Sequence, residues 1–259
     1  MNFKKAVIFL GCAAPVCALL NCLVMFFTVE TSSGFFRTGY SSLAVLMLGI
    51  VAVLIILSAV AFSRIKRPNS PAFWPYIGAL LSVALGICFL AEAFKFTPLV
   101  GTTPTLAALI RIFAVLSGIV FVWRGVNELS FVPILREIYI IPIIYMILKV
   151  VTTFIAYAGV ATIIETVFEL FAICAMLIFT LNFAKSQNGI TNKKGAGLSA
   201  PLCVVCALVI LTQIAPYAVN YFAKEEALLH ANSLFTPTSV VLSLFIISVS
   251  IFKNQKELD

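Results

Sequence analysis

The stretch that decides the fold runs from Ile138 to Phe183 and reads IYIIPIIYMILKVVTTFIAYAGVATIIETVFELFAICAMLIFTLNF. It is apolar almost throughout. It is too long for one crossing, because a helix needs only about 20 residues to span a hydrocarbon core of roughly 30 Å. Gly159 is the only glycine of the stretch, so we place a turn there. We therefore expect two membrane helices, 138–157 and 160–183.

A turn near Thr152 and Thr153 is the alternative. It would bring Lys149 up to the membrane surface and draw Arg136 and Glu137 into the bilayer. The two positions of the turn thus predict different depths for Lys149.

Each of the two expected helices carries a polar face. By i, i+3 and i+4 spacing these faces hold Tyr145, Lys149, Thr152 and Thr153 on the first helix and Thr162, Glu165, Thr166 and Glu169 on the second. With the turn at Gly159, Lys149 and Glu169 are equally distant from it along the chain. At a rise of ~1.5 Å per residue, both lie about 15 Å from the turn. We expect the two polar faces to meet each other or to line a common cavity.

The composition is that of a membrane protein. Of 259 residues, 62% are hydrophobic and only 10% are charged, too few to cover a soluble core of this size. The seven cysteines all fall in apolar stretches, and an odd number buried in lipid argues against a disulfide framework. The lipid bilayer is therefore the first partner that the sequence predicts.

Six further apolar stretches are long enough to cross a bilayer. A cleaved signal peptide is the rival interpretation of the first, but its apolar run is longer than a typical signal core. We expect an all-α fold, a polytopic membrane protein that forms one domain over residues 1–259 as a bundle of eight transmembrane helices. The expected spans are about 6–28, 42–62, 73–94, 105–123, 138–157, 160–183, 199–222 and 234–252.

Two segments of the chain carry more specific expectations. The third span has Gly78, Ser82 and Gly86 at four-residue steps, a stripe of small residues that lets a neighbouring helix approach closely. Residues 124–137 mix charged and apolar side chains, so we expect an interfacial segment there.

The orientation follows from where the basic residues lie, because the loops rich in lysine and arginine face the cytoplasm in most membrane proteins. The loops on the side of the N-terminus hold Lys4, Lys5, Arg64, Lys66, Arg67, Arg124, Arg136, Lys185, Lys193, Lys194, Lys253 and Lys256. The loops on the other side hold Arg37, Lys95 and Lys224. We therefore expect a multi-pass protein of the cell membrane with both termini in the cytoplasm.

The charged residues inside the spans gather at one depth in this topology. A single charge near mid-bilayer costs roughly 2.5–3.5 kcal/mol, so several of them are expected to face the protein interior, to pair or to meet water. All are expected in the outer half of the membrane, and they are our candidate ligand-binding residues: Lys149, Glu165, Glu169, Arg111 and Glu92. If all ionise, one net negative charge remains, which suits a bound cation, an amine or a proton.

Catalytic signatures are absent from the sequence. It contains no His-Glu-x-x-His, no Gly-x-Ser-x-Gly and no phosphate-binding loop. His230 is the only histidine and Asp259 the only aspartate, which excludes a His-rich metal site and a paired-aspartate protease. The basic loops also lack the interleaved aromatic residues of a nucleic-acid module. We expect no enzyme, no cofactor, no metal site and no nucleic-acid partner.

Two functions remain open. The first is a transporter or binding protein for a small cationic or zwitterionic solute, in which Glu165 and Glu169 neutralise the bound charge and Glu92 lies nearer the outer mouth. Lys149 and Arg111 would then hold those carboxylates between binding events. The second is a membrane scaffold, sensor or accessory subunit in which the same charges form a structural network.

Overall fold

The described part of the chain is helical. A computed structural model describes residues 3–28, 39–63, 71–96, 102–130, 135–158, 164–188, 199–212 and 235–251. The helices are α1 (Phe3–Thr28), α2 (Ser41–Ser63), α3 (Trp74–Lys95), α4 (Pro104–Ser130), the 3₁₀ helix η1 (Arg136–Tyr139), α5 (Ile140–Ala158), α6 (Ile164–Gln187), α7 (Ala200–Leu211) and α9 (Phe235–Ile251).

Six helices of the described residues are long and apolar enough to cross a membrane, namely those from α1 through α6. The helices α7 and α9 are apolar but shorter, and they lie within the expected seventh and eighth spans. The predicted class, a polytopic helical membrane protein, is confirmed, and the expected count of eight fits the described helices loosely.

Two boundaries test the sequence predictions. Helix α5 continues without a break to Ala158, so the alternative turn at Thr152 and Thr153 is excluded; the expected turn at Gly159 lies outside the described residues. Helix α4 continues to Ser130, so the expected end of the fourth span at residue 123 was too early, and residues 124–130 belong to the same helix as that span. The helix accommodates its polar last turns because their side chains find partners inside the bundle, as described below.

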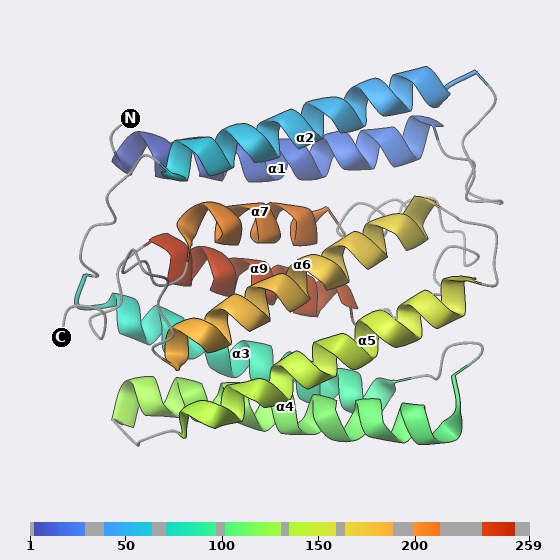
Figure 1. Ribbon diagram of the computed structural model, residues 1–259. Helices are drawn as coiled ribbons and strands as arrows, with labels where there is room; N and C mark the ends of the chain where they lie inside the picture. The colour runs from blue at the N-terminus through green and yellow to red at the C-terminus, as the bar shows by residue number, and fades with distance from the viewer. Residues whose placement is uncertain are drawn as a thin grey trace.

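Consecutive helices run in opposite directions (Figure 1). At one end of the bundle, where α1 begins, the Trp74 indole at the start of α3 donates to the carbonyl of Ser248 near the end of α9 at 3.1 Å. At the opposite end, the Asn21 amide of α1 donates to the carbonyl of Thr212, just after α7, at 3.3 Å. We call these the N-terminal end and the opposite end of the bundle. Helix α1 begins and α9 ends at the same end, as an even number of crossings requires.

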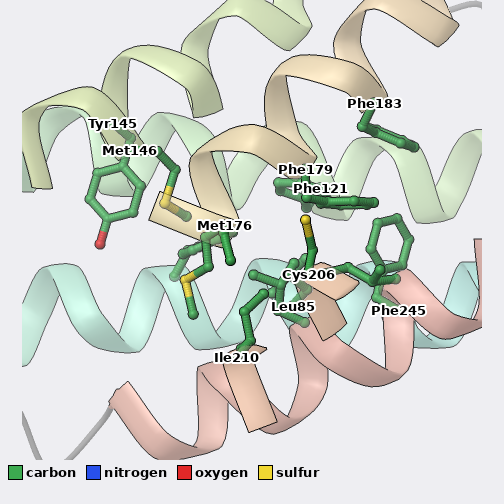
Figure 2. Packing of buried hydrophobic residues seen from close by; sticks show 14 of the residues in the cluster. Leu85, Phe121, Tyr145, Met146, Met176, Phe179, Phe183, Cys206, Ile210 and Phe245 are labelled. Atoms are coloured by element: carbon green, nitrogen blue, oxygen red, sulfur yellow. The ribbon is translucent and has the colours of Figure 1, made fainter. Parts of the chain in front are cut away.

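The helices form a main bundle and an outer pair. The outer pair, α1 and α2, contacts α7 through apolar residues such as Leu10, Phe62 and Val204. The main core lies among α3, α4, α5, α6, α7 and α9 and is rich in aromatic and sulfur-containing side chains (Figure 2). Tyr145 and Met146 lie at one edge of the region shown, and Phe183 and Phe245 lie at the other.

The closest helix pair of the core is α3 with α4. A Cβ built on Gly86 would lie 2.6 Å from the carbonyl oxygen of Gly118, and one on Gly125 would lie 2.7 Å from that of Ala79. Ser82 adds a hydrogen bond, donating to the carbonyl of Phe121 at 2.8 Å. The backbones therefore touch where glycines allow it, as the stripe of small residues on α3 predicted. We refer to these two helices as the α3–α4 hairpin.

We expect Gly86→Ala to lower the free energy of unfolding by about 1–3 kcal/mol, because the new methyl group meets backbone that cannot rotate away. Gly49→Ala is the matched control, since nothing lies within 4 Å of a Cβ at Gly49 on α2. There, the higher helix propensity of alanine should leave stability equal or raise it by up to about 1 kcal/mol. Thermal unfolding of both variants in detergent measures the difference, and equal losses would contradict the packing described.

Candidate functional site

A buried ion pair joins α3 to α5. The Lys149 ammonium lies 2.9 Å from Oε2 of Glu92, and the hydroxyl of Tyr145 donates to the same oxygen at 2.6 Å. The exposed fractions of Glu92, Lys149 and Tyr145 are 7%, 8% and 2%. We call these three residues the Glu92 cluster. Both charges lie inside helices that are apolar enough to span a membrane, and the protein buries most of the surface of the pair.

Helix geometry brings the three side chains together. Tyr145 and Lys149 are four residues apart, so they project from one face of α5, with the ammonium 5.7 Å from the centre of the tyrosine ring. Glu92 lies in the last turn of α3 and meets this face from the neighbouring helix. The ring of Phe89, one turn before Glu92, packs edge-on against that of Tyr145 at 5.5 Å and closes the apolar side of the cluster.

The two carboxylate oxygens of Glu92 differ in their hydrogen bonds. Among the residues that the structure describes, buried Oε1 has no hydrogen-bond partner, whereas Oε2 accepts two hydrogen bonds. A buried polar atom without a partner costs about 1–3 kcal/mol, more when it is charged. Native structures rarely keep such an atom, and each one calls for an explanation such as strain, a functional role, a bound water or an ion. Glu92 therefore presents one unused acceptor position inside the membrane-spanning part of the protein.

The side of α3 next to Glu92 faces α9. Cys88, one turn before Glu92, contacts the side chain of Thr238 and lies within electrostatic range of the Glu92 carboxylate. Thr238 and its neighbour Ser239 are both buried. The Cys88 thiol thus links the surroundings of the carboxylate to the Thr238 side chain of α9.

The structure brings together two of the five candidate residues, Glu92 and Lys149. Arg111 is placed elsewhere: it is exposed, donates to the carbonyl of Phe96 at 2.9 Å and stacks over the Phe96 ring at 5.9 Å. Arg111 therefore does not join Glu92 and Lys149, because a long arginine side chain can reach away from the apolar zone to a polar partner. Glu165 and Glu169 lie on the first turns of α6, and their side chains are outside the described part of the structure.

A second charged cluster lies at the N-terminal end of the bundle, and the sequence alone did not predict it. Arg124 is only 3% exposed and is paired with Glu128, one turn further along α4. Its guanidinium lies 4.9 Å from the ring centre of Phe183 on α6 and 4.8 Å from that of Phe245 on α9.

Two more groups complete the surroundings of the guanidinium. Ser82 of α3 accepts a hydrogen bond from Arg124 at 3.5 Å, and the Tyr139 hydroxyl of η1 is a further hydrogen-bond partner. We call Arg124 and the groups around it the Arg124 cluster. The signal available in the sequence was the Arg124 and Glu128 spacing of four residues, which suits an ion pair on one helix.

No metal site is evident among the described residues, where no three His, Cys, Asp or Glu side chains gather. The described cysteines form no disulfide with one another, and Cys203 and Cys206 of α7 pack in the core. What the Glu92 cluster can do chemically is bind charge: the carboxylate accepts hydrogen bonds from an amine, and the ammonium donates to a carboxylate.

The chain was compared with known proteins at three levels. No family model, no curated protein and no solved structure matches it. The function therefore has to be argued from the geometry of this chain.

We expect Glu92→Gln and Lys149→Met each to lower the free energy of unfolding by about 3–5 kcal/mol, because each leaves the opposite charge buried without its partner. The double variant should lose clearly less than the sum of the two, since it buries no charge. Unfolding in detergent, followed for the four proteins of this cycle, measures the coupling.

The control for this cycle is Lys185→Gln, because Lys185 is exposed on the last turn of α6. It should change stability by less than about 0.5 kcal/mol. Additive losses for Glu92→Gln and Lys149→Met would show that the two charges do not interact.

Proposed function

We propose that this integral membrane protein binds and transports a small cationic or zwitterionic solute, and that the Glu92 cluster is its binding site. The observation that carries the proposal is Oε1 of Glu92, a buried carboxylate oxygen without a hydrogen-bond partner. An ionisable residue inside a membrane span is costly and typically marks a solute or ion pathway.

The chemistry of the cluster suits a solute with an amine. An ammonium group approaching Glu92 finds Oε1 free to accept, and it competes with Lys149 for the negative charge. Lys149 then acts as an internal substitute that neutralises the carboxylate while no solute is bound. While no solute is bound, this arrangement avoids a bare carboxylate in the bilayer, where a single charge costs roughly 2.5–3.5 kcal/mol.

Within this class, the described pair favours a zwitterion. Glu92 and Lys149 together are neutral, so a bound cation would leave one uncompensated positive charge. A zwitterion offers an amine to Glu92 and a carboxylate to Lys149 and keeps the site neutral. Tyr145 holds Oε2 in place through its hydroxyl group and so orients the carboxylate. Glu165 and Glu169 of the following helix stay candidates for further contacts to the solute.

A second candidate function is a scaffold or accessory subunit in which the ion pair only ties α3 to α5. The burial of all three side chains of the Glu92 cluster favours it, because a closed ion pair needs no solute. The two functions predict different results for the same substitutions.

Uptake by reconstituted proteoliposomes tests the proposal, with methylammonium and choline as cationic probes and glycine and betaine as zwitterionic ones. For Glu92→Gln we expect the half-saturating concentration of the transported probe to rise about tenfold or more, because a hydrogen bond to a charged group contributes about 1.5–3 kcal/mol. Lys185→Gln should transport like the wild type. If Glu92→Gln changes no flux of any probe, the proposal is wrong.

The charge-swapped variant separates the two functions. Glu92→Lys combined with Lys149→Glu restores an ion pair between α3 and α5, so a purely structural role predicts recovery of the melting temperature. A binding site also needs the carboxylate on α3, beside Tyr145, Cys88 and Thr238. We expect stability to recover and uptake to stay lost.

A further inference from the structure

The α3–α4 hairpin is built to move as one unit. Its two helices touch backbone to backbone at Gly86, Gly118 and Gly125, so sliding one helix past the other would make the chains collide. Ser82 ties the pair further through the carbonyl of Phe121. Any change in shape of the bundle is therefore concentrated at the outer surfaces of this hairpin and not between its helices.

Besides single hydrogen bonds such as that from Trp74 to Ser248, two charged clusters hold the hairpin to the rest of the bundle at places far apart. The Glu92 cluster joins α3 to α5, and the Arg124 cluster joins α4 to η1, α6 and α9. Along α3, Glu92 and Ser82 are ten residues apart, which is about 15 Å at ~1.5 Å per residue.

The contacts between these two places are apolar. Leu85 of α3 packs in the core together with Met146 of α5 and Met176 of α6, which lie nearer Tyr145 (Figure 2). Methionine side chains are flexible and adapt to changes in packing, and apolar contacts have no fixed direction. This middle zone can act as the pivot of a small rotation, whereas the polar clusters at its two ends cannot stretch.

We propose that the α3–α4 hairpin rocks against α5, α6 and α9, with the Glu92 cluster and the Arg124 cluster as the two closures of an alternating-access cycle. This inference rests on the proposed transport function. Both clusters are formed in the structure described, which is then the occluded conformation. Opening one closure gives access to the site from one side of the membrane, while the other stays shut.

The two closures differ in what their opening separates. Glu92 and Lys149 belong to different sides of the moving boundary, so opening there pulls opposite charges apart and needs a solute to replace the lost contact. Arg124 and Glu128 both belong to α4 and travel together. Opening at the N-terminal end therefore parts the guanidinium from aromatic rings and a hydroxyl group, and leaves its charge paired. We therefore expect the opening of the Glu92 closure to depend on solute, and that of the Arg124 closure not to.

Thiol labelling with a membrane-impermeant maleimide, without any solute, tests this rocking motion. In a background without other cysteines, Cys88 reports on the Glu92 closure, and Ala184→Cys, next to Phe183 in the core, reports on the Arg124 closure. We expect Glu92→Gln to raise Cys88 labelling from the opposite end about tenfold, and Arg124→Gln to raise labelling at position 184 from the N-terminal end about tenfold.

Each substitution should leave the other reporter within about twofold of its starting rate. Cys22 on α1, outside the moving helices, is the control for general loosening and should not change. If either substitution raises both reporters together, or raises neither, the two-closure inference is wrong. Tyr145→Phe and Arg124→Lys are milder variants that give the same pattern at smaller amplitude if the first pair fails to fold.

The labelling experiment and the uptake experiment can fail independently of each other. Reporters that respond one at a time in a protein that moves no probe would support the rocking motion and overturn transport. Uptake that depends on Glu92 in a protein whose reporters rise together would support transport and overturn the two closures.

Discussion

The structure depends on the cost of placing charge where water cannot reach it. Glu92 and Lys149 are tolerable inside the bundle only as a pair, and the pair requires that the carboxylate of α3 and the ammonium of α5 stay within hydrogen-bond distance. The same constraint explains Arg124, whose charge is met by Glu128 on its own helix and by aromatic rings on two others. Where these partners lie fixes how the helices of the main bundle are joined.

Glycine packing and charge pairing hold different parts of the bundle together. The glycines of α3 and α4 bring two backbones together without any polar contact, and so produce a firm hairpin. The polar clusters hold this hairpin to its neighbours at a few points only. In a membrane, where the hydrophobic effect gives little preference between lipid and helix, such specific contacts decide which helices associate. In a bundle built in this way, we expect a conformational change to separate the helices at these few polar contacts.

The two clusters illustrate different uses of burial. Arg124 has a partner on every side that the structure describes, including a carboxylate, a serine, a tyrosine and two rings. Glu92 keeps one oxygen without a partner in an equally buried position. A polar group whose hydrogen-bonding capacity is filled stabilises one conformation, whereas a polar group with an unused acceptor favours a ligand that donates to it. This difference is why we propose the binding site at Glu92 and the second closure at Arg124.

The sequence by itself determined the class of protein, the positions of the apolar helices and the close packing on the stripe of Gly78, Ser82 and Gly86. These follow from hydrophobicity, helix length and residue size, which are local properties. It could not choose the partner of Lys149, because reasoning from the turn at Gly159 considers one hairpin only and overlooks α3. It also grouped Arg111 with the candidate site residues and placed Arg124 in a loop. Only the tertiary structure decided these points, since a side chain's surroundings depend on which faces of distant helices meet.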